Sequence, residues 1–83
     1  MLIPSPKVLS MYVINQRKVL KLTQADVADR VGLKQKTISA FENKPENTKL
    51  ETLFRILSAV NLDMNLLPKD ETVSVESQWK EGW

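Results

Sequence analysis

Apolar side chains recur at intervals of three and four residues through most of the first sixty positions of the chain. This spacing places them on one face of a helix, and it predicts four helices, the last of them capped by Asn47 or Thr48. The helices are expected over about residues 6–21, 24–31, 35–42 and 49–60, with a loop at 43–47. The side chains predicted to face the core from the first three helices are Leu9, Tyr12, Val13, Gln16, Val27, Ala28, Val31, Ile38 and Phe41. The apolar residues of the predicted fourth helix are Leu50, Leu53, Phe54, Ile56, Leu57 and Val60.

Residues with strong capping preferences mark the ends of the first two helices. Ser5 followed by Pro6 is typical of a helix start, because the N–H that proline lacks has no helical partner at that position. Thr23, with Asp26 three residues later, fits a capping box at the start of the second helix. Gly32 is suited to the left-handed position that ends this helix.

The stretch 62–66 alternates apolar and polar residues with a period of two, which favours a short strand. Leu62, Met64 and Leu66 share one face of it, and Asn61 is suited to end the preceding helix. No second strand is predicted, so its open edge would be paired by the same strand of a second subunit. The alternative is a loop that folds back. Residues 69–83 are polar and without helical periodicity, which favours a flexible tail after one domain at 1–68.

The composition narrows the classes of function. The 83 residues leave room for one domain, and they include no cysteine and no histidine. Disulfides, thiolate nucleophiles, imidazole bases and the usual zinc ligands are therefore excluded. The chain has two glycines and no phosphate-binding loop, so we expect no cofactor, no small-molecule substrate and no enzymatic activity. No apolar run is long enough to span a membrane and no secretion signal is visible, which favours a cytoplasmic location.

Charge is distributed unevenly along the chain, although the net charge is only +2. Residues 1–49 contain nine Lys and Arg against four Asp and Glu, a net of +5, whereas residues 50–83 contain three against six, a net of −3. A basic first half suggests a polyanionic partner, and an acidic end suggests a different role. The alternative explanation is an uneven solvated surface with no specific partner.

The stretch Gln24–Asn43, QADVADRVGLKQKTISAFEN, has the spacing of a helix-turn-helix. Such a motif needs a small residue where its helices cross, a residue that tolerates positive φ at the turn, and an aliphatic residue that packs back between the helices. Ala28, Gly32 and Ile38 meet these needs at successive spacings of four and six residues. The combination predicts a mainly α domain of four to five helices that binds DNA.

These residues resemble the phage-repressor family (Cro/C1, also called XRE) over about residues 5–61. The resemblance implies that the N-terminal end of the third helix lies in the major groove while the second helix spans the backbone. The base contacts that it implies are Lys34, Gln35, Lys36 and Ser39, with Gln35 suited to adenine and the lysines to guanine. The phosphate contacts that it implies are Gln24, Thr37, Asn43 and Lys44. Arg17 and Glu42 match a structural pair that ties the first helix to the end of the third. The alternative is that the lysines and small polar residues are ordinary surface.

A narrower resemblance is to the HipB-type antitoxins of HipA-like serine/threonine kinase toxin systems. It rests on SP at the first helix, KQ-x-TIS-x-FEN in the third, the segment NKPENT, the predicted strand and a polar tail that ends in Trp83. It implies a bacterial, nucleoid-associated homodimer that pairs its 62–66 strands and binds palindromic operators as an autorepressor. It also implies that the chain holds the kinase toxin inactive, with Trp83 docked on the toxin. Two alternatives stay open: a stand-alone phage-type regulator without a toxin, and an interaction module that no longer binds DNA.

Overall fold

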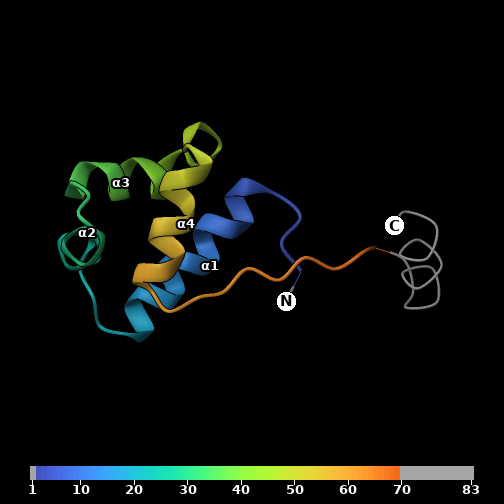
Figure 1. The fold of residues 1–83 in the computed structure, drawn as a ribbon, viewed down its shortest axis with the longest axis horizontal. Coiled ribbons are helices and arrows are strands. Elements are labelled where there is room, and N and C mark those ends of the chain that lie inside the picture. Colours follow the sequence, from blue (N-terminus) through green and yellow to red (C-terminus); the bar gives the residue numbers. More distant parts are fainter. Residues whose placement is uncertain (1, 70–83) are drawn as a thin grey trace.

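The computed structural model describes residues 2–69 of the chain, which form a mainly helical helix-turn-helix fold (Figure 1). The elements are α1 (Pro6–Val19), α2 (Gln24–Val31), α3 (Gln35–Asn43), the short 3₁₀ turn η1 (Pro45–Asn47) and α4 (Leu50–Ala59). α2 packs on both α3 and α4, while α1 contacts α3 and η1. Within this part of the chain, no helix is both long enough and apolar enough to cross a membrane.

Helix α1 begins where the sequence predicts and ends two residues earlier. The Ser5 hydroxyl accepts a hydrogen bond from the Val8 N–H at 3.2 Å. At the other end Lys21 has φ +59°, and the Leu22 N–H donates to the carbonyl of Arg17 at 3.0 Å. This is a Schellman motif, in which a left-handed residue closes the last carbonyls of the helix. The predicted extension to Lys21 is wrong because a lysine takes the position that glycine usually fills.

The second helix and its turn form as predicted. Thr23 and Asp26 make the reciprocal capping box, with the Thr23 N–H donating to the Asp26 carboxylate at 2.9 Å and the Asp26 N–H donating to the Thr23 hydroxyl at 3.0 Å. Gly32 has φ +68°, and the next residue, Leu33, donates its N–H to the carbonyl of Ala28 at 2.9 Å. Glycine adopts this conformation without the steric cost that a Cβ brings. The chain therefore turns sharply from α2 into α3.

Helix α4 begins later than predicted and ends as predicted. Pro45–Asn47 forms η1, and the Thr48 N–H donates to the carbonyl of Pro45 at 3.1 Å. Thr48 is therefore used by the turn, and the N-cap of α4 is Lys49, which makes no side-chain capping bond. The expected cap by Asn47 or Thr48 is wrong. Asn61 has φ +60° and closes the helix, since the next N–H donates to the carbonyl of Leu57 at 2.9 Å.

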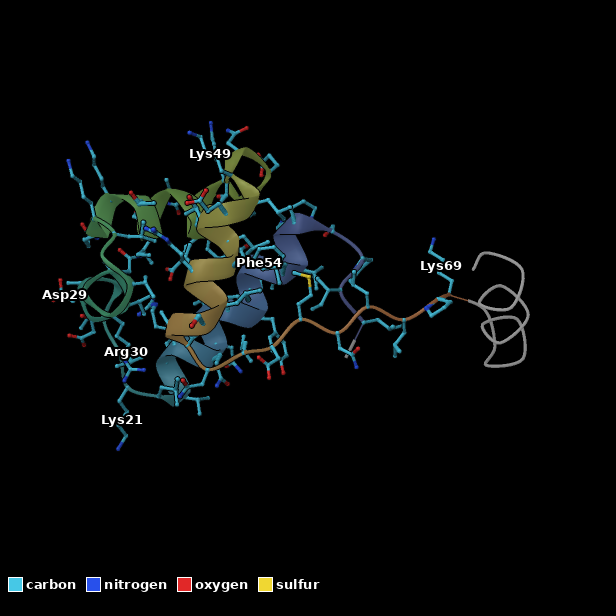
Figure 2. The ribbon with its side chains drawn as sticks, viewed as in Figure 1. Lys21, Asp29, Arg30, Lys49, Phe54 and Lys69 are labelled. Carbon is cyan, nitrogen blue, oxygen red and sulfur yellow. The ribbon has the colours of Figure 1, made fainter. Side chains whose placement is uncertain are left out.

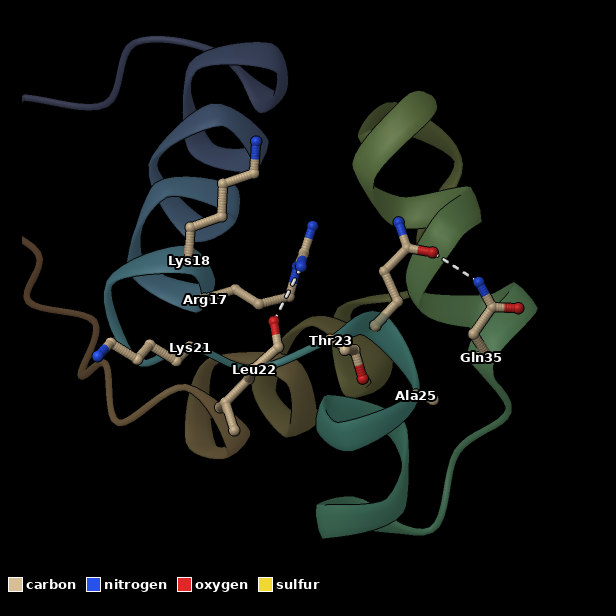
Figure 3. Close-up of a pocket in the computed structure, with 8 residues that line it drawn as sticks. Arg17, Lys18, Lys21, Leu22, Thr23, Ala25 and Gln35 are labelled. Carbon is tan, nitrogen blue, oxygen red and sulfur yellow. Dashed lines mark hydrogen bonds between the residues drawn. The ribbon is translucent and has the colours of Figure 1, made fainter.

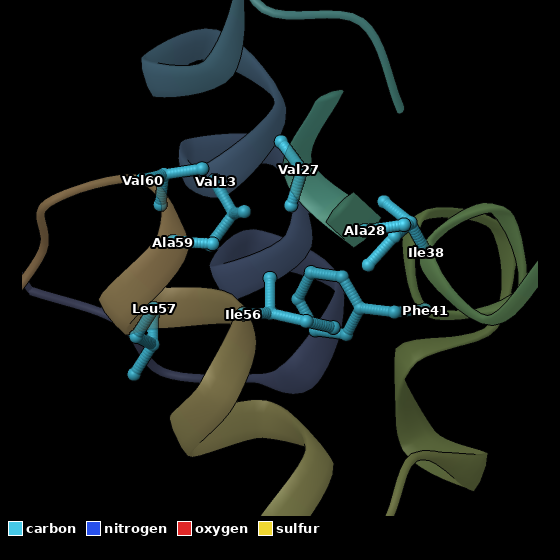
Figure 4. Packing of buried hydrophobic residues seen from close by; sticks show 9 residues of the cluster. All are labelled: Val13, Val27, Ala28, Ile38, Phe41, Ile56, Leu57, Ala59 and Val60. Atoms are coloured by element: carbon cyan, nitrogen blue, oxygen red, sulfur yellow. The ribbon is translucent and has the colours of Figure 1, made fainter. Parts of the chain in front are cut away.

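The core gathers one side chain or more from every α-helix (Figure 4). Its buried apolar members are Val13, Val27, Ala28, Ile38, Phe41, Ile56, Leu57, Ala59 and Val60. Two further bonds tie helices to the end of α4: the Gln16 amide donates to the carbonyl of Val60 at 3.1 Å, and the Arg30 guanidinium donates to the carbonyl of Ala59 at 3.0 Å. The apolar contacts and these bonds together fix α1 and α2 against α4.

Two apolar residues of α4, Leu50 and Phe54, do not join this core. They are 64% and 51% exposed. They lie four residues apart and so share one face of α4, whereas the core takes its contacts from Ile56, Leu57, Ala59 and Val60. The helix thus has a second apolar face that the described residues leave open to solvent (Figure 2).

Residues 62–68 follow α4 as an irregular extended chain that leads away from the helices (Figure 1). The strand predicted at 62–66 is not present in residues 2–69, where no strand forms. A strand is defined by hydrogen bonds to a neighbouring strand, and this single chain offers none. The predicted flexible tail, with Trp83, lies at residues 70–83 outside the described residues.

Candidate nucleic-acid interface

The N-terminal end of α3 is an exposed polar part of the helix-turn-helix. Lys34, Gln35 and Lys36 are all exposed there. Lys34 is the N-cap and makes no side-chain capping bond. The first N–H groups of a helix have no partner within the helix, and they carry the positive end of its dipole. This end therefore presents backbone donors, two ammonium groups and one amide side by side.

The other predicted base contact, Ser39, lies one helical turn beyond Gln35 and is half-buried. Asn43 lies one further turn along, and its amide donates to the Ser39 hydroxyl at 3.3 Å. Residues four apart share a face of a helix, so Gln35, Ser39 and Asn43 form one polar stripe along α3. The structure thus brings together two residues that the sequence assigns to different contacts, one to a base and one to a phosphate.

The remaining predicted phosphate contacts are spread over the motif. Lys44 is exposed at the C-terminal end of α3, and Thr37 is half-buried beside the core residue Ile38. Gln24 is the first residue of α2 and is half-buried. Its amide is held by neighbours on α3, because its nitrogen donates to Glu42 at 2.8 Å and its oxygen accepts from Gln35 at 2.6 Å. The second of these bonds joins a predicted phosphate contact, Gln24, to a predicted base contact, Gln35.

Arg17 and Glu42 form a bidentate ion pair between α1 and the end of α3. The Arg17 Nε lies 2.8 Å from Glu42 Oε2, and its Nη2 lies 3.1 Å from Oε1. The third nitrogen, Nη1, donates to the carbonyl of Leu22 at 3.0 Å. The side chains are 13% and 6% exposed. A pair this well enclosed and hydrogen-bonded holds its geometry firmly.

A groove opens between the end of α1 and the first turns of α2 and α3 (Figure 3). It is lined by Arg17, Lys18, Lys21, Leu22, Thr23, Gln24, Ala25 and Gln35. Lys18 of α1 and Lys21, two residues beyond the end of that helix, are exposed cations that line the same groove as Gln35. Both lysines contribute to the positive charge of residues 1–49, but the sequence pattern predicted no DNA contact for either of them. The signal that could have found them is their position at the end of the helix that precedes the motif.

The Thr23 capping box also lowers the pKa of an acidic side chain in the first turn of α2. The Thr23 N–H, and to a smaller extent its hydroxyl, hold the pKa of the Asp26 carboxyl below its ordinary value. Because folding lowers this pKa, the hydrogen bonds from Thr23 to the ionised Asp26 stabilise the folded state. That stability is fully present above the pKa of Asp26 in the unfolded chain, and it is lost as the pH falls through the pKa in the folded chain. Asp26 therefore stays ionised at neutral pH and supports the start of α2, where a negative charge is favoured by the helix dipole.

Two short helices joined by a tight glycine turn, with the second one exposing a basic and amide-bearing end, define a helix-turn-helix protein. The chain belongs to the helix-turn-helix family HTH_3, whose model matches residues 13–67. Across residues 2–69, no cluster of acidic, histidine or cysteine side chains could hold a metal ion.

The similarity extends to particular members of this family. The chain is 52% identical over 44 residues to antitoxin HipB of Escherichia coli strain K12, a match that covers 53% of this chain and 50% of that protein. It is 36% identical over 63 residues to antitoxin HigA1 of Mycobacterium tuberculosis, which covers 76% of this chain and 42% of that protein. The matched part thus spans about half the length, or less, of these curated relatives.

Solved structures agree with the sequence relatives. A chain in the structure of a HipA-HipB-O2-O3 complex superposes with a TM-score of 0.81 at 40% identity, covering 84% of this chain and 99% of that one. A HipB-O4 20mer complex gives the same TM-score, identity and coverage. The resemblance to HipB-type antitoxins that the sequence suggests is confirmed.

Proposed function

We propose that this chain is a dimeric, sequence-specific transcriptional autorepressor that also acts as the antitoxin of a HipA-like serine/threonine kinase. The observation that carries the proposal is the exposed end of α3, where Lys34, Gln35 and Lys36 project together from a helix-turn-helix unit. An α-helix fits the major groove, where an amide side chain can bond adenine and a lysine can bond guanine. Similarity to proteins named HipB and to a HipA-HipB complex supports both halves of the proposal.

The experiment that tests DNA binding is a titration at several salt concentrations. The probes are a duplex from immediately upstream of the protein's own gene and a scrambled duplex of the same composition. We expect the upstream duplex to bind at least about 1,000-fold more tightly, as specific complexes do. We also expect a steep loss of affinity with salt, because bound lysines release counterions from phosphates. Equally weak binding of both duplexes would overturn the proposal.

Gln35→Ala tests base contact at α3. We expect it to weaken binding to the upstream duplex by about 1–3 kcal/mol and to relax the preference at one base pair of each half-site. The measurement is a competition assay with duplexes that carry each base pair in turn. Lys44→Ala is the matched control, since loss of a phosphate contact should weaken all duplexes alike. An equal loss on scrambled DNA for Gln35→Ala would contradict direct contact with a base.

A second copy of the chain is the proposed cover for the open apolar face of α4. Leu50 and Phe54 are exposed on this helix, and Met64 is 42% exposed on the segment that follows it. Phe54 and Met64 line one shallow hollow together with Leu57 and Leu62. In the neighbouring segment, the backbone of residues 63–66 makes no hydrogen bond within residues 2–69, and it could pair with its own copy as a strand. Both features would be satisfied at once by a two-fold homodimer on a palindromic operator.

Met64→Lys is expected to weaken this dimer at least about tenfold, because an ammonium group would replace apolar surface at the interface. Sedimentation velocity over a range of protein concentrations measures the dissociation constant. Asn65→Lys is the matched control, since it adds the same charge at the next residue, on the other face of the predicted strand. A dimer equally stable in all three proteins would remove Met64, Leu62 and Leu66 from the interface.

The antitoxin half of the proposal assigns toxin contact to Trp83. An aromatic residue near a chain end supplies a large apolar surface with one polar handle, which suits docking in a pocket. We expect deletion of Trp83 to leave operator binding unchanged and to weaken co-purification with a co-expressed HipA-like kinase. Trp79→Ala provides the comparison, since it removes the other tryptophan of the tail. Unchanged association with the kinase after deletion of Trp83 would reject this contact.

A further inference from the structure

The groove between the end of α1 and the first turns of α2 and α3 has no acidic side chain among its lining residues. Three of those residues are cations: Arg17, Lys18 and Lys21. Two carboxylates bond to lining residues, but both are already engaged. Glu42 accepts from Arg17 at 2.8 Å, and Asp26 accepts from the backbone at the start of α2 at 2.9 Å. Positive charge is therefore left over in the groove once the Arg17–Glu42 pair has been counted.

The charge that is left over belongs to Lys18 and Lys21. The two residues are joined by one turn of backbone, since the Lys21 N–H donates to the carbonyl of Lys18 at 3.0 Å. Both side chains are exposed, and within residues 2–69 neither ammonium group makes an ion pair or a hydrogen bond. Arg17 differs from them, because its nitrogens are taken by Glu42 and the carbonyl of Leu22. The two lysines are thus the cations of this groove that an outside anion could use.

The position of the lysines relative to α3 indicates which part of a DNA duplex they would meet. Figure 3 shows the end of α1 on one side of the groove and Gln35 on the other, with the start of α2 between them. The N–H groups of Gln24 and Ala25 open α2 and donate no hydrogen bond within residues 2–69. Free N–H groups at a helix start favour an anion. The lysines therefore stand beside these donors, on the side away from the candidate base contact.

A DNA strand is an anion of the right form for this arrangement, because it carries a phosphate about every 3.4 Å along the helix axis. With α3 in the major groove, the start of α2 lies against the strand that borders the groove. The same strand would then continue past the end of α1. A lysine ammonium is a point charge on a flexible stem, so it can reach a phosphate without a fixed bonding geometry.

We propose that Lys18 and Lys21 bind backbone phosphates of the operator, at the edge of the major groove that lies away from the base contacted by Gln35. They extend the DNA contact of the helix-turn-helix to the end of α1. Phosphates carry no sequence information, so this contact raises the affinity for every duplex and leaves the base preference unchanged. The inference rests on the proposed function, since it concerns the same interface.

The test removes both charges and keeps the fold. Lys18→Gln retains a polar side chain, and it is combined with Lys21→Asn, because asparagine tolerates the left-handed φ of +59° better than most residues. The matched control is Lys7→Gln with Lys69→Gln, which removes the same charge from two exposed lysines that do not line the groove. The full-length wild-type protein and both double variants are titrated at several salt concentrations against the upstream duplex and the scrambled duplex.

We expect the variant at positions 18 and 21 to bind both duplexes at least about tenfold more weakly at low salt, because it neutralises fewer phosphates. The slope of log affinity against log salt should become shallower by about two for each bound protomer, since each lysine on a phosphate adds about one. The ratio of the affinities for the two duplexes should not change. The control variant should stay close to the wild type in affinity and slope.

Ethylation interference on the upstream duplex then locates the contact. Ethylation removes the charge of one phosphate and blocks a protein that needs that charge. We expect a set of phosphates whose ethylation blocks the wild type and the control but no longer affects the variant at 18 and 21. This set should lie away from the base pair that Gln35→Ala identifies.

Each other result gives a definite answer. If the variant and the control lose the same affinity, the effect is one of net charge and the inference is overturned. Identical interference patterns for the wild type and the variant would also overturn it. If circular dichroism shows that the double variant does not fold, Lys18→Gln alone carries the test, with half the expected change in slope. A wild type that binds both duplexes equally weakly overturns the proposed function, whereas a discriminating wild type that is insensitive to both lysines overturns only this inference.

Discussion

Replacement of Glu42 by alanine is expected to lower the free energy of unfolding by about 3–5 kcal/mol, a large part of the roughly 5–15 kcal/mol that stabilises a typical domain. The Arg17 side chain is 13% exposed, so its guanidinium would be left charged and mostly enclosed. Its bond to the carbonyl of Leu22 would satisfy only one of its nitrogens. Gln24 would lose its acceptor in the same step. The cost thus comes from an uncompensated charge more than from the lost attraction.

Urea unfolding followed by circular dichroism measures this effect. The matched control is the double replacement Arg17→Met with Glu42→Leu, which removes both charges and keeps apolar volume between α1 and α3. Replacing a whole enclosed ion pair in this way is often neutral or even stabilising. We therefore expect the double variant to be clearly more stable than Glu42→Ala. If the single replacement costs less than about 1 kcal/mol, the pair is effectively solvated and its enclosure does not matter.

Phe41→Ala is expected to destabilise the domain by about 3–5 kcal/mol. Phe41 is 1% exposed and stands among the largest side chains of the core, where it packs with Ile38 and Ile56 (Figure 4). The core is small, so the cavity left by the ring cannot be filled by distant side chains without disturbing α3 itself. Because α3 carries the candidate DNA contacts, operator binding should fall with the folded fraction.

Phe54→Ala makes the same chemical change on a side chain that is 51% exposed. Its cost should be small in the isolated domain and should grow with protein concentration, because the proposed dimer would cover Phe54. The cost of Phe41→Ala should not depend on concentration. Urea unfolding of both variants at two protein concentrations separates these expectations. A cost for Phe41→Ala below about 1 kcal/mol would show that the core repacks around the missing ring.

Those parts of the fold that depend on local chemistry could be predicted from the sequence. The start of α1 at Ser5, the capping box of Thr23 and Asp26, and the left-handed Gly32 are each decided within a few residues. The exposed row at the start of α3 follows from the same periodicity. Local hydrogen bonds and steric limits favour only one arrangement at these positions, so the structure agrees with the prediction.

Other features depend on contacts that sequence spacing does not encode. The 3₁₀ turn at Pro45 takes the residue that was expected to cap α4, and the open face of α4 follows from how that helix is rotated against α2. The predicted strand at 62–66 needs a partner chain. At the candidate interface, the pairing of Arg17 with Glu42 could be inferred from family resemblance. The links from Glu42 through Gln24 to Gln35 could not, because they join residues 18 and 11 positions apart.

Lys21 shows that stability is not the only demand on this fold. The left-handed conformation at the end of α1 costs an ordinary side chain on the order of 1 kcal/mol relative to glycine. A glycine there would thus strengthen the domain, yet the position holds a lysine that lines the same groove as Gln35. On the proposed function, an ammonium group in this groove would attract the DNA backbone. On the proposed function, folding and affinity therefore make opposite demands on the residue at the end of α1, and the lysine provides a cation at the cost of a strained turn.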